Sequence, residues 1–469
     1  MTTEVSDLTR GVRALVDGNM ERLWQDLACL VEIPSHAANP EGVQNARHAV
    51  VRLFQQAGIA HVEEVAVSHD GRTATPLVYG EHPAPPVAGA PTVLLYAHYD
   101  VQPPGDGWDT RPFIATENEI AGVRRLYGRG AADEKSGICM HLAMLRMFGK
   151  AMPVNLKLVI EGEEETGTGI LENYLASETG RADHRFTADL IVMADTGNVR
   201  RGQPTITTSL RGLVAVDVTV STLRDPVHSG VYGGPAPDAF MAFARMLTAL
   251  QDDQGDVMIR LDKEDLGWPG VPEERFRHDA GVLEDVRLIG TGPLAERLYG
   301  KPSVNVVGLD GVPPMAGATN ALCPTVTAQI SVRLSPHQNL NQARERLAAR
   351  LREVAPWGAR VEVTPANEGA GFAADPDTPR MKDAHTALEQ AYDGKPVVHA
   401  GQGGAIPLAS AFRVANPQAD ILLWGCEEPT CAIHAPNESV SFSELQSMTE
   451  AEALLLKASA KNTQKDAPP

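Results

Sequence analysis

Apolar positions along the chain follow two different periods, which together predict an α/β protein. Short, mainly apolar runs at 93–96, 156–160 and 190–194 have the length expected of buried strands in a parallel sheet. Between the first two runs, residues 136–148 carry apolar side chains at helical spacing. Strands that alternate with helices in this way predict an open α/β layer.

The same pattern continues at both ends of the chain. We expect helices over 12–31 and 43–57, where apolar residues recur at helical spacing. Beyond residue 380 the pattern predicts a helix over 381–392, a strand over 421–424 and a final helix over 442–459. The two ends are therefore expected to build one α/β domain together.

The middle of the chain has a different pattern. Residues 205–222 alternate valine with polar side chains, which predicts a partly exposed strand, and residues 252–300 form a long irregular stretch. The other expected elements are a helix over 236–251, strands over 303–307 and 325–334, a helix over 339–354 and a strand over 360–364. This β-α-β-β-α-β order predicts a small α+β (ferredoxin-like) domain with helices on one face of an antiparallel sheet.

A length of 469 residues exceeds the size at which a single core stops growing, so two domains are expected. We predict an α/β domain with a central, mostly parallel sheet, built from residues 1–206 and 381–469. Residues 207–380 are expected to form a second domain inserted into it.

Charge and composition exclude several classes of protein. A formal net charge of −19 argues against nucleic-acid binding. No apolar run approaches the roughly 18 residues of a membrane span, and the first residues lack the pattern of a secretory signal. The five cysteines are odd in number and scattered, which indicates reduced thiols. We therefore expect a cytoplasmic protein.

Imidazole and carboxylate side chains follow the three predicted strands at the point where each ends. His98 and Asp100 follow the first strand, an acidic run that ends at Glu165 follows the second, and Asp195 follows the third. Ligands gather at the carboxyl ends of strands in open α/β sheets. These side chains are therefore expected to meet at one edge of the sheet and to form a metal site.

A site for two metal ions also needs a carboxylate that bridges ions about 3.5–4 Å apart. Neutral imidazole and carboxylate ligands suit zinc, manganese or cobalt. The candidate ligands are His98, Asp133, Glu165, Asp195 and His434.

Other catalytic motifs are missing or incomplete. Gly128-x-Gly130-x-x-Asp133 resembles a dinucleotide-binding loop, but it lacks the third glycine and no clear strand precedes it. The sequence contains no G-x-S-x-G, Walker or H-E-x-x-H motif, which argues against the commonest serine hydrolases, nucleotide-binding proteins and single-zinc proteases.

Several motifs occur together, in an order that resembles the M20 family of metallopeptidases and most closely its cytosolic dipeptidase (carnosinase-like) branch. The matching segments are YAHYDVQP at 96–103, GRGAADEKSG at 128–137, EGEEETG at 161–167, DPVHSGVYGG at 225–234, SVRLSP at 331–336, GGAIP at 403–407 and HAPNE at 434–438. This resemblance covers nearly the whole chain.

The resemblance implies a set of metal ligands with two zinc or manganese ions in each subunit. His98, Asp133 and Asp195 would hold one ion, and Asp133, Glu165 and His434 would hold the other. Asp133 would bridge the two ions.

It also implies catalytic roles for two acidic residues near these ligands. Asp100 would hydrogen-bond to His98 and orient its ring. Glu164 would be the general base, which deprotonates a metal-bridging water and later gives the proton to the leaving amine.

The inserted domain is expected to act as a lid and as the contact of a homodimer. In related dimers the residue matching His228 reaches the partner's active site and stabilises the oxyanion. Arg333 would bind the free carboxylate of a small peptide, and Asn320 would make a further substrate contact. The turn at Gly403 and Gly404 would bring main chain close to that carboxylate.

The resemblance therefore implies a di-metal hydrolase that cleaves dipeptides or short peptides with a free C-terminal carboxylate. Two positions depart from the family pattern: Gln402 replaces a common glutamate, and Ala405 replaces a serine or threonine. The first departure favours an alternative, an amidohydrolase of the same fold that acts on N-acyl or N-carbamoyl amino acids. A catalytically silent binding relative is a further alternative, which the complete set of ligands and base argues against.

Overall fold

The computed structural model describes residues 2–59, 61–85 and 89–465, which divide into two compact units. Each unit has its own hydrophobic core. The first unit is built from Met1–Thr208, Ala374–Ala400 and Leu408–Pro469, and the second from Ser209–Ala373 and Gly401–Pro407. Among the described residues, no helix combines the length and the apolarity that a membrane span requires.

The first unit is organised around parallel strands. In spatial order these are β8 (Asn155–Glu161), β5 (Thr92–His98), β9 (Leu190–Met193) and β19 (Asp420–Leu423). Successive residues of β9 are all buried, and since they point to opposite faces, both faces of the sheet are covered. The predicted α/β fold with a central, mostly parallel sheet is confirmed.

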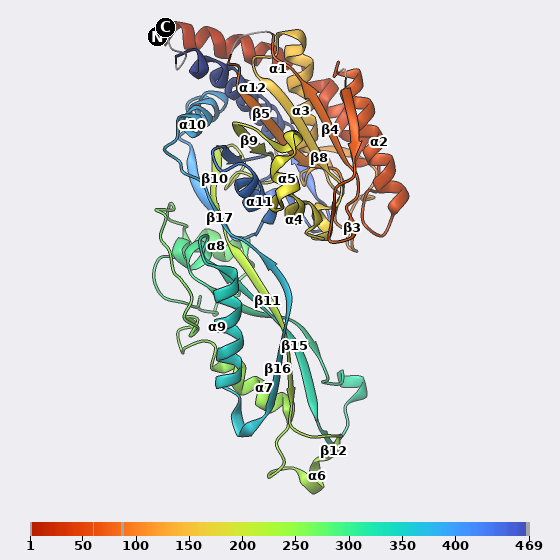
Figure 1. Cartoon of the computed structure of the whole chain (residues 1–469), viewed down its shortest axis with the longest axis vertical. Helices are drawn as coiled ribbons and strands as arrows, with labels where there is room; N and C mark the ends of the chain where they lie inside the picture. The colour runs from red at the N-terminus through yellow and green to blue at the C-terminus, as the bar shows by residue number, and fades with distance from the viewer. Residues whose placement is uncertain (1, 60, 86–88, 466–469) are drawn as a thin grey trace. The chain divides into compact units, whose positions relative to one another are not determined.

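Antiparallel strands flank this parallel centre. The strands are β4 (Leu77–His82) and β1 (His61–Val65) beyond β8, and β10 (Thr205–Leu210) beyond β19. Helices α1 (Thr2–Val31), α3 (Lys135–Phe148) and α12 (Phe442–Lys465) pack against one another, and α3 also packs on β5 (Figure 1). Helix α2 (Pro40–Gln56) contacts β1 and β4, and α10 (Pro379–Ala391) contacts α12 and β19.

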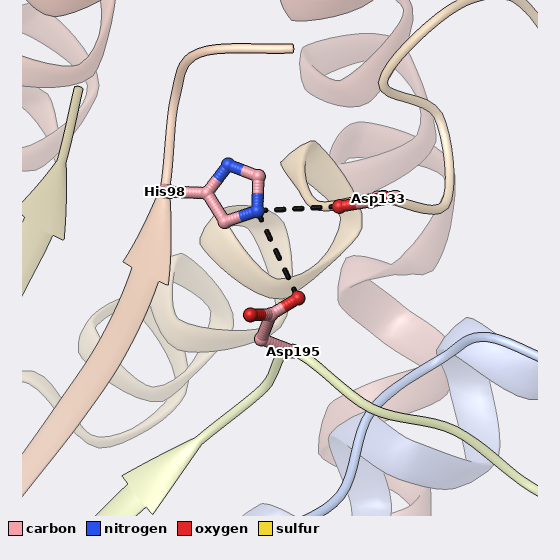
Figure 2. A group of neighbouring side chains, drawn as sticks. All are labelled: His98, Asp133 and Asp195. Atoms are coloured by element: carbon pink, nitrogen blue, oxygen red, sulfur yellow. Dashed lines mark ion pairs between the residues drawn. The ribbon is translucent and has the colours of Figure 1, made fainter. Parts of the chain in front are cut away.

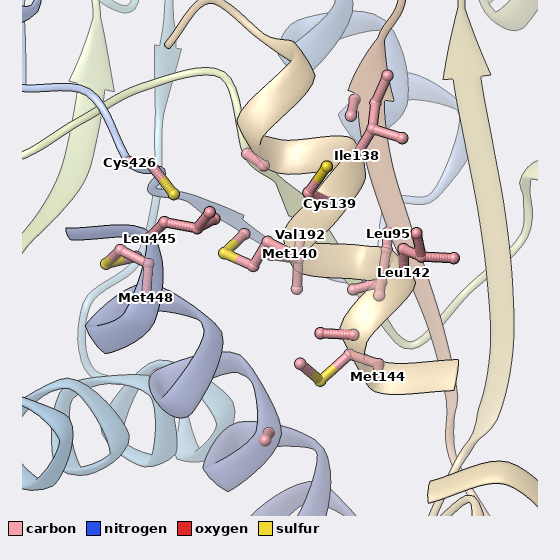
Figure 3. Close-up of a cluster of buried hydrophobic side chains, with 14 of the residues drawn as sticks. Leu95, Ile138, Cys139, Met140, Leu142, Met144, Val192, Cys426, Leu445 and Met448 are labelled. Atoms are coloured by element: carbon pink, nitrogen blue, oxygen red, sulfur yellow. The ribbon is translucent and has the colours of Figure 1, made fainter. Parts of the chain in front are cut away.

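Helix α3 is at the centre of the core of the first unit. Figure 3 shows its side chains together with residues of strands β5 and β9 and of helix α12. The labelled residues are Leu95, Ile138, Cys139, Met140, Leu142, Met144, Val192, Cys426, Leu445 and Met448. Because close packing on these apolar side chains restrains β5 and β9, the polar residues at their ends are held in fixed positions.

The second unit has the predicted ferredoxin-like order of elements. The elements are β11 (Gly212–Ser221), α7 (Ala239–Thr248), β13 (Ser303–Asp310), β15 (Thr325–Leu334), α9 (Leu340–Glu353) and β16 (Arg360–Gly369). The strands form a four-stranded antiparallel sheet in the order β13-β15-β11-β16, and α7 and α9 pack against it. The α+β fold expected for the middle of the chain is confirmed.

Two local details differ from the sequence pattern. The strand expected over 205–222 is two strands, β10 and β11, which join different sheets on either side of Arg211. Residues 401–407 pack with the second unit, because Gly401 lies against Tyr299 and Trp268, and the Gln402 carbonyl accepts a hydrogen bond from the Arg211 N–H.

A small antiparallel sheet in the first unit precedes the loop that contains Asp133. Its strands are β6 (Thr116–Ile120), β7 (Val123–Tyr127) and β20 (Ser439–Ser441), in the order β20-β7-β6. The expectation that no clear strand precedes Gly128 was therefore wrong, because two arginines interrupt β7 (VRRLY) and the strand does not form an apolar run. A dinucleotide-binding loop still does not fit, since β7 pairs antiparallel with both neighbours.

The remaining elements are short. They are β2 (Ser68–His69), β3 (Arg72–Thr73), α4 (Ile170–Ala176), α5 (Glu178–Ala182), β12 (Val227–His228), α6 (Ser229–Tyr232), α8 (Glu273–Asp279), β14 (Ala321–Leu322), β17 (Phe372–Ala373), β18 (Val398–Gln402) and α11 (Pro407–Ala415).

Candidate metal centre

His98 is the last residue of β5, and its buried ring faces carboxylates on two sides. Nε2 lies 3.2 Å from Oδ1 of Asp133 and 3.8 Å from Oδ1 of Asp195, as Figure 2 shows. Nδ1 lies 3.0 Å from the main-chain oxygen of Asp100 and 3.5 Å from its Oδ1. The bond to Asp100 orients the ring so that Nε2 faces the other two carboxylates.

A second group of ligands shares Asp133 with the first. Nε2 of His434 lies 2.8 Å from Oδ2 of Asp133 and 3.3 Å from Oε2 of Glu165. In each group the candidate ligand atoms lie within 4.8 Å of one another. The structure thus brings all five predicted ligands together, and Asp133 directs one oxygen to each group.

The residues of both groups fit divalent cations. Nε2 of His98 is buried and has no hydrogen-bond partner among the described residues. A buried polar atom without a partner is costly, and a cation bound between His98 and the carboxylates would satisfy it. Two imidazoles and three carboxylates are donors that zinc and manganese accept.

The electrostatics of the centre also favour positive charge. Hydrogen bonds to Asp133 and then to Glu165 raise the pKa of His434 to about 10. Burial acts to lower the pKa of His98, but the attraction of the neighbouring carboxylates of Asp100, Asp133 and Asp195 raises that pKa well above its usual value. The carboxylates therefore attract cationic charge to both places where an imidazole nitrogen faces them.

Asp100 links the end of β5 to the turn that carries Glu164 and Glu165. Its Oδ1 accepts the Glu164 N–H at 3.2 Å, and its Oδ2 accepts the Glu165 N–H at 3.0 Å. Burial, and then repulsion from Asp195, raise the pKa of Glu164 well above its usual value. The Glu164 carboxyl therefore holds a proton more tightly than an ordinary glutamate side chain.

Glu438 holds the loop that carries Asp133, a role that the sequence pattern does not indicate. Its Oε2 accepts from Arg129 Nη1 at 2.7 Å and from the Gly130 N–H at 3.0 Å. Its Oε1 accepts from the N–H groups of Ala132 at 3.0 Å and Asp133 at 3.1 Å. The fully buried Glu438 carboxylate is therefore the centre around which this loop folds.

In the second unit the structure brings His228 and Asn320 together. His228 is exposed on β12, opposite Ala321 of β14, and its Nδ1 accepts the Gly230 N–H at 3.0 Å. The main-chain oxygen of Asn320 accepts the Ser229 N–H at 2.9 Å. Both residues therefore lie at one end of the two-stranded β12–β14 ribbon.

Arg333 and the turn after β18 also belong to the second unit. Arg333 lies on β15 between Ser303 and Leu213, and the described residues place no carboxylate within ion-pair distance of its guanidinium. Burial lowers its pKa. Gly403 and Gly404 have no atom within 4 Å of the place where a Cβ would stand, so the space beside this turn is open.

Comparison with known proteins identifies the family. A family model described as Peptidase family M20/M25/M40 matches residues 94–458. This chain belongs to that family of peptidases, as its motifs indicated. It is 35% identical over 449 residues to a cysteinylglycine-S-conjugate dipeptidase of Corynebacterium striatum, and the match covers 93% of this chain and 95% of the relative.

Two solved structures have the same fold. The dipeptidase Dug1p from Saccharomyces cerevisiae has a TM-score of 0.77 at 20% identity, and the match covers 97% of this chain and 98% of that chain. Human carnosine dipeptidase 1 has a TM-score of 0.76 at 23% identity, with 97% and 99% covered.

The buried ion pair between Glu438 and Arg129 is expected to contribute to the stability of the folded protein. Glu438→Gln should lower the free energy of unfolding by about 3–5 kcal/mol, because it leaves the Arg129 guanidinium buried without a charged partner. Urea denaturation measures this change. Glu389→Gln, at an exposed position of α10, is the control and should have little effect. Equal stability of the two variants would contradict the role of Glu438.

Proposed function

We propose that this peptidase hydrolyses dipeptides or short peptides with a free C-terminal carboxylate, and that it uses two divalent ions, zinc or manganese. The observation that carries the proposal is the pair of ligand groups that share Asp133. The similarity to a dipeptidase over 93% of this chain supports the substrate class.

In this proposal His98, Asp133 and Asp195 hold one ion, and Asp133, Glu165 and His434 hold the other. When bound, such ions polarise the carbonyl of the scissile bond and make water more acidic. The residues of the chain then move the proton.

Glu164 is the proposed general base. It takes a proton from the attacking water and returns it to the leaving amine. The raised pKa of its buried carboxyl supports this role, because a stronger base accepts the proton more readily. Asp100 keeps the turn in place through its hydrogen bonds to the N–H groups of Glu164 and Glu165.

Residues of the second unit are proposed to bind the substrate. The Arg333 guanidinium binds the free carboxylate through paired donors, for which it has no competing carboxylate partner among the described residues. Main chain at Gly403 and Gly404 contacts the same carboxylate, and Asn320 makes a further contact. His228 stabilises the oxyanion that forms as the carbonyl is attacked.

We further propose that the second unit is a lid and the contact of a homodimer in the cytoplasm. Strand β13 is an edge of its sheet, and Val306, Val307 and Leu309 on this strand are 41%, 59% and 46% exposed. An exposed apolar edge strand is suited to pairing with another chain. Through such a dimer, His228 would serve the active site of the partner subunit.

All five cysteines are free thiols, which is consistent with the reducing environment of the cytoplasm.

A substrate panel tests the proposed function. Purified protein supplied with Mn²⁺ or Zn²⁺ should hydrolyse dipeptides, among them cysteinylglycine and its S-conjugates, and should leave N-acetyl and N-carbamoyl amino acids intact. The neutral side chain of Gln402, which stands where the family commonly has a glutamate, favours the alternative of a substrate without a cationic amino group. Turnover of blocked amino acids alone would replace the dipeptidase proposal with an amidohydrolase.

The substitution Glu164→Gln tests whether Glu164 is the general base. Hydrolysis should fall by about 10²–10⁴-fold, because the amide cannot accept the proton, whereas the number of bound ions should stay the same. Initial rates and elemental analysis of the same preparation measure the two quantities. Glu178→Gln, an exposed change at the start of α5, is the control. Unaltered turnover in Glu164→Gln would remove this residue as the base.

Mixing two inactive variants tests the dimer and the cross-subunit role together. Glu164→Gln and His228→Ala homodimers should each be slow. After subunit exchange, a mixed dimer has one active site with both an intact Glu164 and an intact His228 supplied by its partner. The mixture should therefore recover activity well above the sum of its components. No recovery, although capture through an affinity tag on one variant shows that mixed dimers have formed, would mean that His228 acts within its own subunit.

A further inference from the structure

Gln102 makes three hydrogen bonds to Glu165, a single residue of the metal centre. Its side-chain Nε2 donates to Oε2 of Glu165 at 2.8 Å and to the main-chain oxygen of Glu165 at 3.3 Å. Its main-chain N–H donates to Oε1 of Glu165 at 3.2 Å. Both carboxylate oxygens and the carbonyl of Glu165 therefore accept hydrogen bonds from Gln102.

Glu165 needs such support because of where it stands in the fold. It lies in the one-turn 3₁₀ helix Glu164–Thr166, outside the strands and long helices that pack on the core. A glutamate side chain has several rotatable bonds, and ordering it costs conformational entropy. Contacts from a neighbouring segment remove that freedom before any ligand binds.

The same short segment supplies the other restraints on this turn. Asp100 holds the N–H groups of Glu164 and Glu165, and Gln102 holds the carbonyl and the carboxylate of Glu165. His98, which begins this segment, is itself a candidate ligand in the first group. The chain from His98 to Gln102 therefore connects one ligand group with the other.

The chemical type of Gln102 suits this task. Its amide is a neutral donor, so it orients the carboxylate of Glu165 without cancelling the negative charge that a cation requires. The oxygen that receives the shorter bond, Oε2, is also the one that lies 3.3 Å from Nε2 of His434. Gln102 thus fixes the oxygen that belongs to the second ligand group.

We propose that Gln102 is a positioning residue that preorganises Glu165 as a ligand of the second ion. This inference rests on the proposed assignment of Glu165 as a ligand and adds a residue that determines the affinity of one of the two ions. Partners that orient a metal ligand typically change metal affinity by about 10–100-fold when they are removed.

Gln102→Met tests the proposal, because methionine keeps the approximate shape of the side chain and removes its donor. Mn²⁺ or Zn²⁺ alone is titrated into the full-length metal-free protein by calorimetry or chelator competition. One of the two ions should bind about 10–100-fold more weakly than in the unaltered protein, and the other should bind as before. At saturating metal, kcat for a dipeptide should recover toward the unaltered value with KM little changed.

Gln203→Met is the matched control, since Gln203 is also a half-buried glutamine whose amide donates to a main-chain oxygen, that of Pro396. It should leave both binding steps unchanged. Two unaltered binding steps in Gln102→Met would overturn the proposal. Equal weakening of both ions with a lower unfolding temperature would also overturn it, because it would mark a general structural role. Since the titration needs no substrate, failure of the proposed dipeptidase activity would be recognised separately in the substrate panel.

Discussion

The carboxylate of Asp133 is the interaction on which the candidate site depends. One oxygen lies 3.2 Å from His98 and the other lies 2.8 Å from His434, so a single side chain joins residues from distant parts of the chain. A buried carboxylate is stable only when cationic or hydrogen-bonding partners compensate for its lost hydration. Here both oxygens face imidazoles, and the loop itself is tied down by Glu438. Because the Asp133 carboxylate must keep these partners, the loop that carries it is fixed by hydrogen bonds to Glu438.

The rest of the first unit serves to place the ligands around this carboxylate. Parallel strands packed on helix α3 restrain the residues at their ends, and those ends carry His98 and, two residues beyond β9, Asp195. Ligands outside the strands have local supports instead. Asp100 and Gln102 hold the turn with Glu165. A constellation held by rigid elements and by hydrogen-bonded neighbours stays close to its productive geometry, which a dinuclear centre requires.

Part of this arrangement could be predicted from the sequence, because buried parallel strands form apolar runs and His98, Glu165 and Asp195 come at or shortly after their ends. The places of Asp133 and His434 in the two ligand groups were implied by the resemblance of their motifs to a family. Contacts that depend on tertiary folding could not be predicted from the sequence. The alternation over 205–222 continues through Arg211, so nothing marks the point where β10 ends and β11 begins. Strand β6 is largely polar and two arginines interrupt β7, so neither strand forms an apolar run. Gln102 and Glu438 stand inside recognisable motifs, yet their partners lie 63 and more than 300 residues away.

If the shared Asp133 makes the two ligand groups one dinuclear centre, the two bound ions must interact magnetically, and electron paramagnetic resonance of the Mn²⁺-loaded protein measures that interaction. Metal-free protein is titrated with Mn²⁺ while bound and free ions are counted. We expect two ions to bind per chain and the second ion to convert the spectrum of an isolated ion into that of a spin-coupled pair. One ion per chain, or two ions whose spectra remain uncoupled at saturation, would contradict it.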